Sequence, residues 1–223
     1  MESAHVYGLS MGGMVAQELA IRFPDRVRAL VLGGTTHGGP RAVLPSPRIA
    51  ATLGSRGAPA ALRAEVLSRA LFTPDFRRQQ PEKVRAYLGL LGQHRTSARG
   101  LVSHLAASTY HDTRARLGRI SAPTLVMHGA TDELTPLANA RLLAAGIPDA
   151  TLAVIGDAAH AYLLEQPEAS HAAFTSWLAA RSPVRPGAGL SRVEGLTEPL
   201  TRHLGLPVGA LRTARSLTSM RRR

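Results

Sequence analysis

One short segment near the start of the chain constrains its fold more than any other. Residues Gly8–Gly12 read GLSMG, and they lie between an apolar run, His5–Leu9, and a helical pattern that begins at Gly13. A chain that turns this abruptly from strand to helix holds the residue at the apex in a strained backbone conformation and lifts its side chain clear of the sheet. The segment therefore predicts a strand, a sharp turn with Ser10 at its apex, and a helix that packs back on the strand.

The residue types in this turn suit a catalytic serine. Gly8 and Gly12 have no side chains, so the helix and the strand can approach closely. The backbone amide of Met11 would lie at the start of the helix, where it can donate a hydrogen bond to the oxyanion of a tetrahedral intermediate. The pattern by itself has low specificity because glycine and serine are common residues, and the alternative is a turn whose serine only caps the helix.

Four short apolar runs predict the strands of a mostly parallel sheet. Each has the length of a strand that is buried on both faces, and each leads into a turn rich in Gly, Asp or Thr. The runs are His5–Leu9, Val27–Leu32, Thr124–Met127 and Leu152–Ile155. Because helical patterns separate or follow them, we expect right-handed βαβ crossovers and an α/β fold in layers.

The helical patterns predict which residues face the core and where the helices end. The pattern at Gly13–Phe23 stops before Pro24, and its apolar face would consist of Val15, Leu19 and Phe23.

A second helix would start at Thr135–Pro136, with Thr135 as the N-cap and Pro136 in the first helical position. Gly146 would follow its end as the C′ residue. A third would begin at Gln166–Pro167 and present Phe174, Trp177 and Leu178 on one side.

The rest of the chain divides into segments of different character. The stretch from His37 to Gly118 is too long for a simple connection, and it contains helical patterns at Pro59–Leu71 and Pro81–Leu91. We therefore expect a helical cap at 37–118, inserted between two parts of the core at 1–36 and 119–182. Proline and glycine then mark a linker, and 183–223 is expected to be a basic, weakly ordered extension.

Two further residues complete a candidate catalytic triad with Ser10. A serine hydroxyl needs a base, and the base needs an acid that orients it. Asp132 follows the third predicted strand and His160 follows the fourth, so all three residues come just after the carboxyl ends of strands, where open parallel sheets place their sites. Asp157 is the alternative acid, but its position favours a role in the turn after the last strand.

These motifs closely resemble the α/β-hydrolase superfamily, in particular small esterases, enol-lactonases and cofactor-free haloperoxidase-like enzymes. The resemblance covers roughly residues 4–180 and rests on Gly8–Leu32, on the GxxDxxxP motif at Gly129–Pro136, and on His160–Glu168. It implies Ser10 as the nucleophile, Asp132 as the acid, His160 as the general base and the Met11 amide as one oxyanion donor. No cofactor or metal is implied.

The chain departs from the family pattern in two places. Many members have glycine where this chain has Ala159, and in the family several strands precede the nucleophile strand that this chain reaches at His5. We therefore expect a sequence that lacks its N-terminal part, with only the C-terminal portion of the fold. Such a chain would have an exposed edge strand and would lack one oxyanion donor, so we expect poor stability and little activity.

The resemblance implies a serine hydrolase that cleaves a small carboxylic ester or lactone through an acyl-enzyme. The same site can support acyl transfer, C–C bond hydrolysis or the perhydrolysis that is seen as haloperoxidase activity, and these alternatives stay open. Epoxide hydrolases and dehalogenases of the family use Asp where this chain has Ser10. An alternative of another class is a non-catalytic, hydrolase-like binding module.

Composition limits the other functions. The net charge is +12, but Lys83 is the only lysine among 27 basic residues, which indicates the codon usage of a GC-rich genome rather than a nucleic-acid site. Residues 183–223 contribute half of this charge, and an amphipathic pattern at Pro207–Met220 could bind anionic surfaces weakly. The absence of cysteine excludes disulfides and thiolate chemistry. Without a signal-peptide pattern or a membrane-spanning segment, we expect a cytoplasmic protein.

Two groups of side chains are open to a functional or a structural interpretation. Four histidines lack the spacing of metal ligands and are expected to be surface or cap residues, namely His37, His94, His104 and His111. Four aromatic residues could line an acyl pocket under the cap or simply pack within it, namely Phe72, Phe76, Tyr87 and Tyr110.

Overall fold

The computed structural model describes residues 2–54, 59–93 and 97–181. Among these residues, four strands form one sheet in the spatial order β1–β2–β3–β4, and every neighbouring pair is parallel. The strands are β1 (Ala4–Leu9), β2 (Val27–Gly33), β3 (Thr124–Gly129) and β4 (Ala150–Ile155). They contain the four apolar runs in full and extend each by one or two residues, which confirms the predicted parallel sheet.

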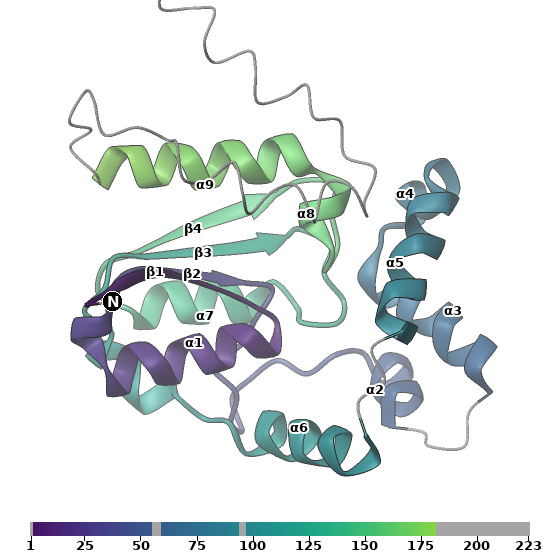
Figure 1. Ribbon diagram of the computed structural model, residues 1–223, viewed down its shortest axis with the longest axis horizontal. Helices are drawn as coiled ribbons and strands as arrows, with labels where there is room; N and C mark the ends of the chain where they lie inside the picture. The colour runs from purple at the N-terminus through teal and green to yellow at the C-terminus, as the bar shows by residue number, and fades with distance from the viewer. Residues whose placement is uncertain (1, 55–58, 94–96, 182–223) are drawn as a thin grey trace, which may run out of the picture.

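Helices cover both faces of this sheet (Figure 1). The helices α1 (Met11–Arg22) and α7 (Ala138–Gly146) lie on one face, and α9 (Pro167–Arg181) lies on the other, with the short α8 (Tyr162–Glu165) before it. The side of α9 predicted to face the core does so, because Trp177 is buried and two neighbours pack beside it, Phe174 and Leu178.

The central strands supply alternate side chains to two separate cores. Leu30, Leu32 and Val126 pack toward α1 and α7, while Val31 and Leu125 pack toward α9. Successive residues of a strand point to opposite faces, so a strand covered on both faces must be apolar at every position. Burying one such side chain stabilises the fold by roughly 1.5–3 kcal/mol, and this explains the uninterrupted apolar runs.

The connection from β2 to β3 contains a group of helices that adds nothing to the sheet. Within the described residues these are α2 (Pro47–Gly54), α3 (Ala60–Leu71), α4 (Pro74–Gln79), α5 (Pro81–Gln93) and α6 (Ala98–Tyr110), followed by the 3₁₀ helix η2 (Arg114–Arg119). Figure 1 shows α2 to α5 beside the end of the sheet toward which the strand arrows point. The position suits a cap, although its predicted boundaries at 37–118 stay a prediction.

Helix α1 buries only part of the face that its sequence pattern predicts. Val15 is 63% exposed and Phe23 is 55% exposed, so the prediction is wrong for these two residues, whereas Leu19 is partly buried and packs against the core. The buried side carries Ala16 and Ala20, whose small side chains let the helix lie close to the sheet. Residue size at the contact, rather than hydrophobicity alone, therefore decides the orientation of this helix.

Helix α7 also differs from its predicted ends. The helix begins at Ala138 with Leu137 as its N-cap, so Thr135 does not cap it. The Thr135 amide instead donates a hydrogen bond to Asp132 Oδ1 at 2.8 Å. Gly146 is the last residue of the helix rather than the residue after it, and a Cβ there would lie 2.6 Å from Leu117 Cδ1. Close packing against η2 is therefore the reason for glycine at this position.

A buried amide joins α1 to both ends of the cap segment. The side chain of Gln17 donates hydrogen bonds to the carbonyl oxygens of Gly13 at 3.1 Å and of Thr36 at 3.0 Å. Its Oε1 accepts a hydrogen bond from Thr113 Oγ1 at 2.6 Å. Every polar atom of the fully buried side chain is thus paired, as its burial requires.

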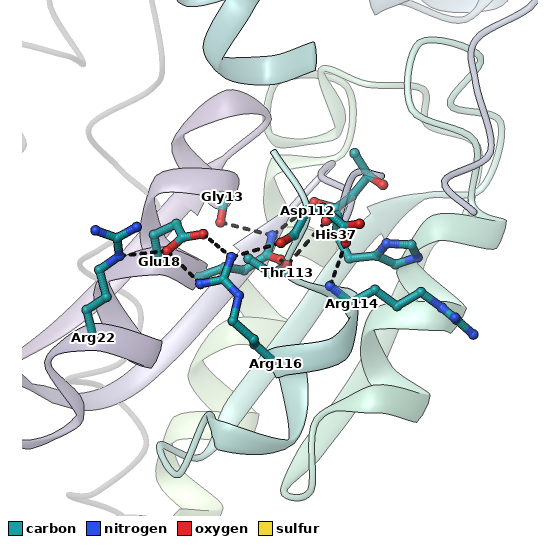
Figure 2. Close-up of polar contacts among 10 residues, drawn as sticks. Gly13, Glu18, Arg22, His37, Asp112, Thr113, Arg114 and Arg116 are labelled. Carbon is teal, nitrogen blue, oxygen red and sulfur yellow. Dashed lines mark hydrogen bonds and ion pairs between the residues drawn. The ribbon is translucent and has the colours of Figure 1, made fainter. Parts of the chain in front are cut away.

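An ion pair strengthens the same junction at the surface (Figure 2). The guanidinium of Arg116 donates to both carboxylate oxygens of Glu18, at 3.0 and 2.6 Å, and Arg22 donates a further hydrogen bond at 2.9 Å. The hydrogen bond from Arg116 is the main reason that the pKa of Glu18 falls from its ordinary value of 4.5 to about 2.

No helix in the described part of the chain has both the length and the apolar character that crossing a membrane requires.

The ion pair of Glu18 provides a test of this junction. Replacing Glu18 by Gln should lower the free energy of unfolding near neutral pH and low salt by about 1 kcal/mol or less, because a partly exposed pair contributes little. Folding lowers the pKa of Glu18, so its contribution is complete above pH 4.5 and is lost as the pH falls toward 2. Urea unfolding curves of the two proteins should therefore converge as the pH falls through this range.

The matched control is Asp25→Asn, because the Asp25 carboxylate makes no ion pair within the described residues. An equal loss of stability in both variants at neutral pH would contradict the proposed role of the pair.

Candidate active site

The predicted sharp turn lies between β1 and α1. Ser10 has φ 54° and ψ −123°, and among the described residues only Ser10 and Asp157 combine a side chain beyond hydrogen with a positive φ. Such a conformation costs about 1–3 kcal/mol and persists only where the surroundings impose it. Here the Ser10 amide donates to the Gly33 carbonyl at 2.8 Å, and the Ser10 carbonyl accepts from the Gly13 amide at 2.9 Å.

The glycines of the turn differ in how much space a side chain would have. A Cβ on Gly8 would collide with the Gly12 carbonyl and would lie 2.7 Å from Gly13 Cα. A Cβ on Gly13 would lie 2.6 Å from the side chain of Thr35. A Cβ on Gly12 would meet nothing within 4 Å, so the prediction that this position must be small for close approach is wrong for the described residues.

The loops after β3 and β4 bring an acid and a histidine together. His160 Nδ1 lies 2.7 Å from Asp132 Oδ2, and both side chains are buried. The other carboxylate oxygen, Asp132 Oδ1, accepts hydrogen bonds from the amides of Leu134 at 2.9 Å and of Thr135 at 2.8 Å. This arrangement fixes the carboxylate and lets it orient the imidazole.

The electrostatics of the loop keep the Asp132 carboxylate ionised. Burial by itself would raise its pKa, but hydrogen bonds from His128 and His160 outweigh that effect and hold the pKa of Asp132 below its ordinary value. A carboxylate that remains charged can stabilise an imidazolium that forms on its partner.

The alternative acid, Asp157, lies in the turn after β4. Its backbone has φ 51°, its side chain is exposed, and its carbonyl accepts a hydrogen bond from Gln166 Nε2 at 3.3 Å. Asp132, and not Asp157, is therefore the carboxylate that His160 contacts.

Ser10 and His160 approach the same end of β2 but are not joined. The Ser10 amide is bonded to Gly33, and a Cβ on the next residue, Gly34, would lie 3.2 Å from His160 Cε1. In the described part of the chain, no hydrogen bond links the Ser10 hydroxyl to His160. Catalytic hydrogen bonds of this kind frequently tighten only when substrate binds. Met11, whose amide is the predicted oxyanion donor, directly follows Ser10 and is the first residue of α1.

A buried carboxylate that the sequence did not single out as functional holds the histidine loop. Glu165 accepts hydrogen bonds from the Ala159 amide at 2.5 Å, from the Thr73 amide at 2.6 Å and from Thr73 Oγ1 at 2.8 Å. The Ala161 amide also donates to the Leu71 carbonyl at 2.8 Å. The cap segment is thus bonded directly to Ala161 and, through Glu165, to Ala159, the two neighbours of His160. The sequence did mark this position, because Glu165 belongs to the His160–Glu168 motif that resembles the family.

The aromatic residues of the cap pack against each other. Phe72 stacks on Phe76 with ring centroids 5.4 Å apart, and the Tyr87 ring meets Phe72 edge-on at 5.6 Å. Together with Ala161 they form a small core between the cap and the histidine loop. Tyr110 is 85% exposed and takes no part in it. Packing is therefore the role that the structure supports for Phe76 and Tyr87, whereas Phe72 packs there and also lines a cavity.

The histidines outside the triad are not all surface residues. His37 and His111 are buried within the segment predicted as the cap, while His104 is exposed and His94 lies outside the described residues. Burial lowers the pKa of His111. No group of three potential ligand side chains that could hold a metal ion occurs among the described residues.

A cavity of about 220 Å³ lies between the cap and the acid and histidine loops. The cap side of its lining includes Phe72 and Arg77, and the core side includes Thr131, Glu133 and Ala159. These core residues are sequence neighbours of Asp132 and His160, whereas Ser10 does not line the cavity. A larger cavity of about 600 Å³ lies elsewhere, between the segment around Asp112 and helix α7.

Comparison with known proteins finds close relatives. A sequence model of the family described as alpha/beta hydrolase fold matches residues 2–167. A pimeloyl-(acyl-carrier protein) methyl ester esterase of Aromatoleum aromaticum is 36% identical, over 75% of this chain and 70% of the esterase. A 3-oxoadipate enol-lactonase of Acinetobacter baylyi is 35% identical, over 73% of this chain and 58% of the lactonase.

Solved structures of hydrolases are also similar to this chain. The crystal structure of a hydrolase from Pseudomonas aeruginosa superimposes with a TM-score of 0.67 and 34% identity, over 80% of this chain and 65% of that protein. The chain therefore spans less than two thirds of this hydrolase and of the lactonase.

The unequal crowding of the glycines predicts unequal effects of substitution. Gly8→Ala should lower the free energy of unfolding by about 1–3 kcal/mol, because the added methyl group meets backbone atoms that cannot move aside. Gly12→Ala, the matched control in the same turn, should leave stability unchanged or raise it slightly, because alanine favours a helix. Thermal unfolding followed by circular dichroism measures both. A loss for Gly12→Ala as large as that for Gly8→Ala would show that the crowding is assigned to the wrong residue.

Proposed function

The chain belongs to the α/β-hydrolase fold family, and on that premise we propose that it is a serine hydrolase that cleaves a small carboxylic ester or lactone through an acyl-enzyme. The observation that carries the proposal is the position of Ser10, strained at the end of β1, beside the edge of the sheet where His160 and Asp132 form a buried pair. The names of the two relatives, a methyl ester esterase and an enol-lactonase, support an acyl substrate.

Each residue has a distinct role in the proposed reaction. Ser10 Oγ attacks the carbonyl carbon while His160 Nε2 accepts the hydroxyl proton, and Asp132 holds His160 Nδ1–H and stabilises the imidazolium. The negative charge that develops on the carbonyl oxygen is bound by the Met11 amide. His160 then protonates the leaving alcohol and activates the water that releases the acyl group. The reaction requires no cofactor and no metal.

The non-catalytic alternative rests on a specific observation. The Ser10 hydroxyl makes no hydrogen bond to His160 within the described residues, as a hydrolase-like binding module would permit. Acyl transfer, C–C bond hydrolysis and perhydrolysis would use the same three residues, so they are variants of the proposal and not rivals to it.

The remaining expectations concern location and surface. We propose a cytoplasmic protein without a specific nucleic-acid partner. Residues 183–223, which include Pro207–Met220, lie outside the described residues, and their weak binding to anionic surfaces stays a prediction.

Labelling with a fluorophosphonate probe tests whether Ser10 is activated. The parent chain should be labelled covalently, whereas Ser10→Ala should not, because the probe reacts only with a serine whose proton a base can remove. Mass spectrometry of the labelled peptide identifies the residue. A folded parent chain that resists labelling would support the binding module instead.

A pair of aspartate variants tests the assignment of the acid. Asp132→Asn should slow labelling by about three to four orders of magnitude, because the amide no longer holds the productive imidazole tautomer. Asp157→Asn is the matched control and should react at nearly the parent rate. Equal rates for the two variants would overturn the assignment.

A further inference from the structure

A second histidine, His128, lies next to Asp132. His128 is in β3, its side chain has no exposed surface, and its Nε2 lies 2.6 Å from the Thr135 carbonyl oxygen and 3.3 Å from Asp132 Oδ2. The proposed reaction assigns this residue no role.

The surroundings of the ring determine where its proton is. A carbonyl oxygen can only accept a hydrogen bond, so Nε2 must carry the hydrogen that is donated to Thr135. The other nitrogen, His128 Nδ1, is buried without a hydrogen-bond partner. A bare lone pair there is tolerated, whereas an unpaired N–H would cost about 1–3 kcal/mol. The hydrogen of His128 therefore lies on Nε2, the nitrogen that faces Thr135 and Asp132.

His128 contacts a carboxylate that three hydrogen bonds already hold. Asp132 Oδ1 accepts two backbone amides, and Asp132 Oδ2 lies 2.7 Å from His160 Nδ1 and 3.3 Å from His128 Nε2. His128 Nε2 also bonds to the Thr135 carbonyl, and the amide of Thr135 is one of the two donors to Oδ1. His128 therefore acts on both oxygens of the acid, on one by direct contact and on the other through Thr135.

We propose that His128 is a positioning residue, which holds the Asp132 carboxylate in place through Thr135 and through its contact with Oδ2, and so holds the imidazole of His160 in its working orientation. The inference rests on the proposed function only for its effect on Ser10, since the orientation of His160 is a property of the folded chain.

The tautomer of His128 is the first test, and it uses the parent chain. Nitrogen-15 NMR near pH 7.5 should show His128 protonated at Nε2 and bare at Nδ1, with the signals assigned by their loss in His128→Gln. A proton on Nδ1 would overturn the proposal, and this measurement needs neither enzyme activity nor a stable core variant.

Two substitutions provide the second test. His128→Gln keeps an N–H group that can point toward both Thr135 and Asp132, whereas His128→Phe keeps a ring of similar shape and removes the donor. The low-field proton resonance of His160 Nδ1–H should persist in the Gln variant and should shift or disappear in the Phe variant. Fluorophosphonate labelling should fall by about tenfold to a hundredfold in the Phe variant, because a small misplacement of a catalytic group has an effect of this size.

The outcomes separate a positioning role from a packing role. If His128 only fills space, the Phe variant should keep the His160 resonance and the labelling rate, and that result would overturn the proposal. Thermal unfolding of both variants shows whether the comparison is between folded proteins. Should the parent chain resist labelling while its His160 resonance still depends on His128, the proposed function fails and the positioning role stands.

Discussion

The burial of one carboxylate organises the candidate site. Removing Asp132 from water is costly, and the fold compensates with contacts from three places: hydrogen bonds from the amides of its own loop and from His160 after β4, and His128 Nε2 of β3 at 3.3 Å. Each donor fixes the segment that carries it. The loops after two strands of the sheet are thereby held in one arrangement, and the charge of the acid is preserved at the point where a histidine needs it.

The histidine loop is attached on its other side to the cap segment. Glu165 bonds to the Ala159 amide and to Thr73 at once, and the Ala161 amide bonds to Leu71. The residues on both sides of His160 are therefore tied to helices that come between β2 and β3 in the chain. A shift of the cap would move these bonds, so the position of the cap and the position of the proposed base are mechanically linked.

The turn at Ser10 is imposed by packing and not by capping. The N-cap position of α1 makes no side-chain hydrogen bond to the helix, so the serine hydroxyl is not used for helix capping. The backbone strain at Ser10 is instead held by hydrogen bonds to Gly33 and Gly13, and by Gly8, where strand and helix approach too closely for a larger residue. A residue held in this way, with an unused hydroxyl at the carboxyl edge of a parallel sheet, is what a nucleophile requires.

The sequence by itself determined the sheet, the strained turn and the order of Ser10, Asp132 and His160 along the edge, because uninterrupted apolar runs and turn residues are local signals of buried parallel strands. Only the tertiary structure decided which face of α1 is buried, since the small residues that fit the sheet prevail there over larger apolar ones. The roles of His128 and Glu165 likewise became visible only in the structure, because the sequence does not show that His128 contacts Asp132 or that Glu165 bonds to Thr73. Contacts between loops are set by the packing of the whole chain, and therefore the sequence identified the participants while the fold determined how they are held.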